Sequence, residues 1–446
     1  MLHRLVRVIF AAPLCASLAQ ARDVLVVEGP AAGVYATLQA AINAAQDGNV
    51  LLLGPGAYAA FSLDGKGLTL AALPGAAVSV GYGSLVQNVP ASSYVVLHGL
   101  STGGAMPSGV DGLALVNNAG HVRLEDCTLR GANSFAGGTI RGGEALWIDA
   151  CAHVALVGCN ATGGNGKNSG SALTAGGSAG DGVRLRNSTL ALHGCELRGG
   201  RGGANGGEGG DGVNAQQSVL FVAGSQLSGG EGGDALTSAL CTGDGGDGWE
   251  LLTTSARSLD NQFTPGAAGG GAQTDCPGVV GAAQELVQAS VVVEPGAARR
   301  LACPTFVRDT QQLQLAVTGE PLDVALLRTN RRATWTYGAS AIGPLLTPAG
   351  PSGSLKLLGA VQPSGALNAS VQPRPLAAGR IARVEFLQLL CDDALGARYN
   401  ASPRHVVVFD DAAGPDCNSN GVPDAFDIAA GGSLDLDLDG QPDECP

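Results

Sequence analysis

Between residues 111 and 266 one sequence unit is written five times in succession. Each copy opens with an acidic residue and a small one, continues with alternating apolar residues, and then runs into glycine. The five openings are Asp111-Gly112, Glu144-Ala145, Asp181-Gly182, Asp211-Gly212 and Asp247-Gly248. Apolar residues two positions apart project from one face of an extended strand. One copy cannot bury that face alone, so the copies are predicted to stack as coils of a solenoid with a continuous interior.

A second regularity indicates the kind of solenoid. Alternating apolar residues precede Cys127, Cys159, Cys195 and Ser225 at one constant offset. Helical periodicity is absent, and the copies are longer than a leucine-rich repeat of roughly 20–29 residues. Both observations favour a parallel β-helix, in which the three cysteines and Ser225 form a stacked and buried row.

The glycine-rich runs hold the surplus length of each copy. They cover residues 131–143, 163–180, 199–210 and 229–246 and consist mostly of Gly, Ala, Ser, Asn and Asp. We expect loops that project from one corner of the coils, where glycine permits positive φ and close passage of neighbouring chains. A disordered linker is the competing interpretation, but it does not explain why the runs alternate with strand pairs.

The segment before the repeats has its own pattern. It reads as a strand at Asp23 to Glu28, a helix at Tyr35 to Ala45, a strand at Val50 to Leu53, and the turn Gly54-Pro55-Gly56-Ala57-Tyr58. On these residues the chain resembles the secreted right-handed β-helix proteins of the pectin-lyase-like superfamily, over residues 23–281. The resemblance implies that the helix caps the first coil and blocks edge-to-edge pairing. It does not imply a particular activity.

Residues 1–21 have the form of a secretory signal peptide. Arg4 and Arg7 precede the apolar run Val8 to Leu18, and Ala19-Gln20-Ala21 is a small-residue cleavage site. A membrane anchor would need about 20 apolar residues, and Pro13 interrupts a shorter run. We therefore expect a bacterial protein that is secreted to the extracellular space, with no transmembrane anchor.

The net charge of the chain indicates which classes of partner it can bind. Removing Arg4 and Arg7 takes the formal net charge from -13 to -15, and phosphate recognition needs clustered Lys and Arg. No nucleic-acid partner is expected. The sequence does not indicate an oligomeric state.

After the β-helix, assigned to residues 22–285, the long glycine runs stop. Residues 291–410 contain short alternating strands separated by Gly and Pro, which predict a small β-sandwich. The expected strands are Gln312 to Val317, Val324 to Leu327, Thr334 to Tyr337, Leu355 to Val361, Ile381 to Leu389 and Val406 to Phe409. The fold class is thus all-β, with a C-terminal tail at residues 411–446.

Ten of the 11 cysteines lie beyond the leader, and an oxidising compartment permits disulfide bonds. Three pairs each fall within one predicted unit: Cys241 with Cys276, Cys303 with Cys391, and Cys417 with Cys445. These are the expected bridges, although spacing alone does not establish a pairing.

The C-terminal tail carries the strongest local motif. Asp416, Asn418, Asn420, Gly421, Asp424 and Asp427 occupy positions 1, 3, 5, 6, 9 and 12 of an EF-hand-type calcium loop. Ca²⁺ takes about six to eight oxygen ligands, and Val422 at position 7 would supply its backbone carbonyl. A second copy follows with Asp435, Asp437, Asp439, Gly440, Gln441 and Asp443, where Gln441 holds position 7. Its twelfth position is Pro446, so this loop is incomplete unless Glu444 or the first loop contributes.

Together the two copies resemble the paired calcium repeats of dockerin and thrombospondin type 3 modules. The resemblance implies a bound Ca²⁺ cofactor. The competing interpretation is an acidic, solvated tail, but two matching copies in tandem do not arise easily by chance.

The acidic residues that open the five copies suggest a second, weaker cation site. Carboxylates stacked about 4.8 Å apart repel one another, and cations would relieve that repulsion. Residues 206–213 and 229–236 also resemble the glycine-rich calcium nonapeptide of RTX proteins, although strands separate these copies. The alternative, which we favour, is that each acidic side chain caps its own turn.

No residue can be assigned a catalytic role. Arg130 and Arg198 share one offset, as do His121 and His153, but neither pair adjoins a compact acidic group. Aromatic residues make up only 4% of the chain, whereas sugar-binding grooves favour exposed aromatic rings. The expected function is non-catalytic: binding or structural support at a cell surface, with an extracellular polysaccharide or a cell-envelope component as partner. The alternative is a polysaccharide lyase or glycoside hydrolase on the same scaffold.

Overall fold

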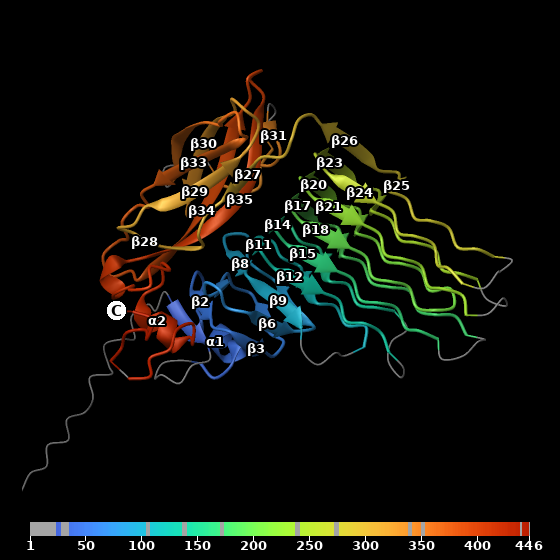
Figure 1. The fold of residues 1–446 in the computed structure, drawn as a ribbon, viewed down its shortest axis with the longest axis horizontal. Coiled ribbons are helices and arrows are strands. Elements are labelled where there is room, and N and C mark those ends of the chain that lie inside the picture. The colour runs from blue at the N-terminus through green and yellow to red at the C-terminus, as the bar shows by residue number, and fades with distance from the viewer. Residues whose placement is uncertain are drawn as a thin grey trace, which may run out of the picture.

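A computed structural model describes residues 24–27, 35–103, 108–135, 141–169, 174–236, 241–271, 276–337, 341–348, 353–437 and 439–445. The predicted signal peptide lies outside these residues. Three long parallel sheets wind along one axis with the sequence, which makes the solenoid a parallel β-helix (Figure 1).

Successive coils add one strand to each of the three sheets. Sheet A consists of β1 (Val24–Val27), β2 (Val50–Leu53), β5 (Thr69–Ala72), β8 (Tyr94–His98), β11 (His121–Glu125), β14 (His153–Val157), β17 (Thr189–His193), β20 (Val219–Ala223), β23 (Ser255–Leu259) and β26 (Ser290–Glu294). Sheet B consists of β3 (Gly56–Tyr58), β6 (Val78–Gly81), β9 (Leu100–Gly103), β12 (Thr128–Arg130), β15 (Asn160–Thr162), β18 (Glu196–Arg198), β21 (Gln226–Ser228) and β24 (Gln262–Thr264). Sheet C consists of β4 (Ser62–Asp64), β7 (Ser84–Gln87), β10 (Leu113–Val116), β13 (Leu146–Asp149), β16 (Val183–Arg186), β19 (Val213–Gln216), β22 (Trp249–Leu252) and β25 (Gln284–Val287).

The predicted interior column is present. Val122 pairs with Val154, and Leu156 pairs with Leu192, so alternate residues of each coil stack on those of the next. The cysteine row is also confirmed: Cys127, Cys159 and Cys195 are at most 2% exposed, and the Cys195 backbone N–H donates to Ser225 Oγ at 3.1 Å. These residues lie where the chain turns from sheet A to sheet B. Their small side chains point into the core and fit the limited space at this corner.

Sheet A extends further than the sequence suggests. Val291 pairs with Ala256 in parallel register, so β26 is the last strand of the solenoid. The coils therefore continue to Glu294, past residue 285, because the long glycine runs that mark the earlier coils stop before β26 whereas the coils do not. At the other end, α1 (Leu38–Ala44) buries Leu38, Ala41 and Ile42 against the first coils.

The glycine-rich runs form an ordered two-layer array, not separate loops. We call the described parts of residues 163–180, 199–210, 229–246 and 265–281 the glycine array; Figure 1 shows its segments leaving the coils as parallel tracks. Donors recur every third residue. Gly199 and Gly202 donate to Ser228 and Glu231 of the next outgoing segment, at 2.9 and 2.8 Å. This spacing means three residues per turn, as in polyproline II.

Hydrogen bonds also join the two layers. Gly200 and Gly203 donate to Gly180 and Gly177 of the returning segment, both at 2.9 Å. Most glycines of the array have negative φ; Gly206 and Gly271 are the described exceptions. Our expectation that glycine serves positive φ here was therefore wrong for most positions. Glycine is required because neighbouring backbones occupy the space of a β-carbon.

The β-sandwich consists of two sheets. Sheet D contains β27 (Arg300–Ala302), β29 (Leu313–Thr318) and β33 (Ala366–Val371). Sheet E contains β28 (Phe306–Arg308), β35 (Arg398–Phe409), β34 (Ala382–Asp392), β30 (Val324–Asn330) and β32 (Ser354–Ala360), with β31 (Ala341–Ile342) paired to β35. The expected strand at Thr334 to Tyr337 is only an isolated bridge between Thr336 and Leu345.

The sandwich packs on the outer face of sheet A. Phe221 and Ala191 of the solenoid share a buried cluster with Leu387 and Val408 of the sandwich, and the Phe386 ring meets Tyr94 edge-on at 4.8 Å. The sandwich therefore covers sheet A and leaves sheets B and C and the glycine array facing solvent.

Two of the three expected disulfides are present, Cys241–Cys276 and Cys417–Cys445. The third is wrong, because Cys303 and Cys391 are free thiols. Cys391 lies on β34 of sheet E, paired with Tyr399, whereas Cys303 lies in the connection from β27 of sheet D to β28 of sheet E.

The C-terminal tail folds back onto the first coils. It contains a short 3-10 helix, η1 (Asp411–Ala413), and α2 (Asp424–Ala429). Val422 is fully buried in a cluster with Leu52, Leu73 and Phe409. Figure 1 shows α2 beside α1, at the same end of the solenoid.

Candidate functional site

The two predicted calcium loops share one hydrogen-bond pattern. In the first, Asp416 accepts the backbone N–H groups of Asn420 and Gly421, both at 3.1 Å. In the second, Asp435 accepts those of Asp439 and Gly440, also at 3.1 Å. Gly421 and Gly440 both have positive φ, 87° and 85°. The same acceptor and the same turn thus recur in both loops, as the matching sequences predict.

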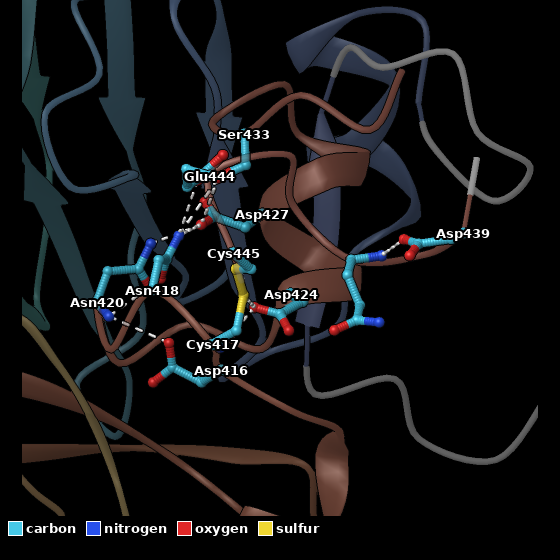
Figure 2. The surroundings of a disulfide bond; sticks show 11 residues. Asp416, Cys417, Asn418, Asn420, Asp424, Asp427, Ser433, Asp439, Glu444 and Cys445 are labelled. Atoms are coloured by element: carbon cyan, nitrogen blue, oxygen red, sulfur yellow. Dashed lines mark hydrogen bonds between the residues drawn. A yellow bond between two sulfur atoms is a disulfide. The ribbon is translucent and has the colours of Figure 1, made fainter. Parts of the chain in front are cut away.

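The first loop gathers its predicted ligands around one buried carboxylate. Asp427 accepts from the side-chain amides of Asn418 and Asn420 at 3.0 and 2.5 Å (Figure 2). Asp427 is 2% exposed and Asp424 is fully buried, and Asp424 Oδ2 has no hydrogen-bond partner. Burial raises the pKa of Asp424. A buried acidic pair of this kind is stabilised by a cation that its oxygens contact.

The second loop is more open. Asp435, Asp437 and Asp443 each place one oxygen within 4.8 Å of the others. Glu444 does not complete this loop, because its Oε1 accepts from Ser433 Oγ, between the two loops, at 2.6 Å and from Asn418 Nδ2 of the first loop at 3.2 Å. The twelfth position, Pro446, lies outside the described residues. The first loop therefore has the fuller set of oxygen ligands, and Cys417–Cys445 ties the two loops together (Figure 2).

A polar groove runs along the outer face of sheet B where it meets the glycine array. Its volume is about 470 Å³. Residues of four consecutive coils line it, among them Thr162, Glu196, Arg198, Gln226, Gln262 and Thr264 from sheet B and Arg201 and Glu231 from the array. Arg198 pairs with Glu196 at 3.1 Å, and Arg201 pairs with Asp234 at 2.6 Å. No aromatic side chain is among the residues that line this groove.

The acidic residues that open the repeats satisfy the backbone of the next coil. Asp111 accepts from the Glu144 N–H at 2.8 Å, Asp181 from the Asp211 N–H at 2.9 Å, and Asp211 from the Asp247 N–H at 2.7 Å. Arg141 pairs with Glu144 at 2.8 Å. These side chains do cap backbone N–H groups, but our expectation that each caps its own turn was wrong, because each reaches across to the following coil.

A cluster of carboxylates continues from this row onto sheet C. The amide of Asn214 donates to both Asp211 and Glu250. Burial, with the charges of Asp211 and Glu285 beside it, raises the pKa of Glu250 to about 7. A half-buried carboxyl with such a pKa can hold or release a proton near neutrality. Sequence reasoning missed Glu250 because its neighbours come from three different coils.

The histidine pair, His121 and His153, is partly buried under the sandwich. His121 and His153 stack with ring centroids 4.8 Å apart, and Trp335 of the sandwich stacks on His153 at 5.8 Å. Of the two arginines that share an offset, Arg198 lines the groove, whereas Arg130 does not.

No helix in the described part of the chain is both long and apolar enough to cross a bilayer.

Comparison with known proteins yields structural likeness only. No family model matches the sequence, and no curated protein matches it. A pectate lyase, Pel9A, aligns over 57% of this chain and 78% of its own at 10% identity with a TM-score of 0.26. The A-module of the Azotobacter vinelandii mannuronan C-5 epimerase AlgE6 covers 58% and 94% at 15% identity, TM-score 0.16. The receptor-binding tailspike protein of bacteriophage Det7 covers 84% and 96% at 10% identity, TM-score 0.16. Scores this low carry no argument about activity; the strand pairing itself defines the parallel β-helix.

Proposed function

We propose that this chain is a secreted, non-catalytic β-helix protein that binds an extracellular polysaccharide or a similar cell-envelope polymer along the groove of sheet B. The observation that carries the proposal is the groove itself, which repeats polar side chains from coil to coil. Strands of neighbouring coils are spaced at roughly 4.8 Å, comparable to the length of one sugar unit. An extended polymer lying along the solenoid axis would meet a similar set of groups at each step.

The chemistry of the groove suits hydroxyl-rich and carboxylated sugars. Gln226 and Gln262 offer both donors and acceptors, and Arg198 offers a planar set of donors that matches a carboxylate. Recognition would rest on hydrogen bonds, since aromatic stacking groups are missing from the lining. We expect a modest affinity for each sugar unit and a higher overall affinity for a polymer that binds through several units at once.

We further propose that Ca²⁺ binds the C-terminal loops and holds the tail against the first coils. Asp416, Asn418, Asn420, Val422, Asp424 and Asp427 would supply the first site, and Asp435, Asp437, Asp439, Gln441 and Asp443 the second. The buried, unpartnered oxygen of Asp424 supports this assignment. The cation would be structural, because both loops lie away from the groove.

Affinity measurements on a panel of neutral and uronic-acid polysaccharides test the binding proposal. Arg198→Ala should weaken binding of a uronic-acid polymer roughly tenfold, because hydrogen bonds to a charged group contribute about 1.5–3 kcal/mol. Gln226→Ala should have a smaller effect in the same direction. Gln216→Ala is the matched control, since Gln216 is exposed on the same coil but on sheet C. Equal effects of Gln226→Ala and Gln216→Ala would contradict the groove as the binding site.

One observation favours the catalytic alternative, a polysaccharide lyase or glycoside hydrolase. Glu250 has a pKa of about 7 and lies beside Asp211, so the pair could divide the roles of acid and base. The test is incubation of the protein with the same polysaccharide panel, with detection of new reducing ends or unsaturated products. Turnover that is abolished by Glu250→Gln would replace the non-catalytic proposal; no turnover on any polymer that binds would retain it.

A further inference from the structure

The seam between the sandwich and sheet A contains a compact group of metal-ligating side chains. His98 and Glu125 are direct cross-strand partners on β8 and β11, so their side chains stand beside each other on the outer face of sheet A. His405 of β35 meets them from the sandwich, with its ring centroid 5.3 Å from that of His98. One ligand atom from each of the three lies within 4.8 Å of the other two.

These side chains keep buried lone pairs that no donor fills. His98 Nε2 contacts Thr305 Oγ1 at 2.8 Å, which leaves His98 Nδ1 without a partner. His405 is buried, and neither of its ring nitrogens makes a hydrogen bond. Its Nδ1 is 2.9 Å from Glu125 Oε2 without hydrogen-bond geometry, and its backbone N–H donates to the same Oε2 at 3.3 Å. Buried polar atoms are nearly always satisfied in native proteins, so orphaned atoms converging from three strands require an explanation.

Two arginines also lie beside Glu125. The distances from their nitrogens to the Glu125 carboxylate show whether they hydrogen-bond to it. Arg123 Nη1 is 3.7 Å from Oε1, and Arg404 Nη1 is 3.8 Å from Oε2. Both distances exceed a hydrogen bond. The short contact of Arg404 goes to Asp126 instead, at 2.6 Å. Glu125 Oε1, which has no hydrogen-bond partner, therefore remains free to bind a further partner.

We propose that His98, Glu125 and His405 bind a divalent transition metal ion of the zinc class, which pins the sandwich to the β-helix. Two imidazoles and one carboxylate form a ligand set that commonly binds Zn²⁺. Tetrahedral zinc would then have a fourth coordination position for a further ligand. Thr305 would orient His98 through the nitrogen that does not bind the metal.

Metal content of the full-length protein tests this proposal. Protein stripped with a chelator is dialysed against Zn²⁺ or Co²⁺ in excess Ca²⁺, which keeps the C-terminal loops occupied. We expect one tightly held Zn²⁺ per chain, an intense visible Co²⁺ spectrum typical of tetrahedral coordination, and a higher melting temperature with Zn²⁺ than without it.

Variants locate the ion. His98→Gln and His405→Gln should each abolish stoichiometric Zn²⁺ binding and the Co²⁺ spectrum. His153→Gln, a histidine of the same seam outside the cluster, should leave both unchanged. Because His405→Gln could disturb folding, the Co²⁺ titration of the unsubstituted protein stands by itself. Absence of Co²⁺ or Zn²⁺ binding there, or binding that survives His98→Gln, would overturn the proposal.

Discussion

A β-carbon on Gly230 would lie 1.8 Å from the carbonyl oxygen of Gly200 in the preceding coil. The Gly230 N–H donates at 2.8 Å to Gly210, in the returning layer between them. Gly230 thus contacts both layers of the glycine array. The space beside its α-carbon holds a hydrogen atom but not a methyl group. The array is a third structural layer of the protein, built from backbone hydrogen bonds with almost no side chains between the segments.

This packing makes glycine at position 230 essential. Gly230→Ala forces the two layers apart, so we expect a loss of about 3 kcal/mol or more in the free energy of unfolding. Gly270→Ala is the matched control in the same array, since its β-carbon would meet only Asp234 Oδ1 at 3.5 Å. Denaturant unfolding of both variants provides the measurement. Equal stability of the two would contradict the close-packed array.

Calcium should stabilise the tail and the end of the solenoid that it covers. We expect a higher melting temperature in millimolar Ca²⁺ than in EDTA, because binding to the folded state alone adds stability. Asp416→Asn removes a charged ligand of the first loop and should reduce the shift, whereas Asp149→Asn, on sheet C, should not. Isothermal titration that shows no heat at millimolar Ca²⁺ would remove the assignment.

Glu250 should make stability depend on pH in a defined direction. Its pKa is raised from 4.5 to about 7 in the folded protein, so its favourable contribution is complete below pH 4.5 and is lost as pH rises through 7. Glu250→Gln removes the ionisation. The variant should melt at a higher temperature than the parent at pH 8, with a much smaller difference at pH 5. A difference independent of pH would contradict the raised pKa.

The buried ion pair of the sandwich should matter more than an exposed one. Arg299 Nε and Asp323 Oδ2 are 2.8 Å apart with both side chains 1% exposed, and the guanidinium lies 3.6 Å from the Tyr399 ring centroid. Asp323→Ala removes the close partner of a buried guanidinium, which then has only the exposed Glu320 at 3.9 Å, and should cost about 3–5 kcal/mol. Asp392→Ala breaks the exposed pair with Arg398 and should cost about 1 kcal/mol or less. Urea unfolding of the two variants makes the comparison.

Local patterns predicted the solenoid because each coil repeats the same short-range signals. The alternation around Val122 and Leu124, the constant offset of Cys127 and Cys159, and the helix at Leu38 all reflect which residues face a core. The same logic failed for the end of the β-helix and for Cys303 with Cys391, because the course of a coil and the distance between two sheets are not local properties.

The calcium motif depends on a local sequence pattern, whereas the groove depends on contacts between distant segments. Asp416 to Asp427 is a contiguous stretch, so its spacing alone predicts which oxygens can meet. The groove joins Thr162, Arg198 and Gln226 from separate coils, and the carboxyl cluster joins Asp211 with Glu250. Their proximity depends on the lengths of the segments between them, which the repeat leaves variable.

The sequence by itself determined that this protein stacks coils, because alternating apolar residues in each copy have no other way to leave water. It also determined that the tail repeats one turn twice, because a glycine with positive φ and the same acceptors recur at equal spacing. The tertiary structure alone decided that the glycine runs pack as two hydrogen-bonded layers, and that His98, Glu125 and His405 converge under the sandwich. Those contacts join segments from separate coils and separate domains, and only the stacking of the whole chain sets the distances between them.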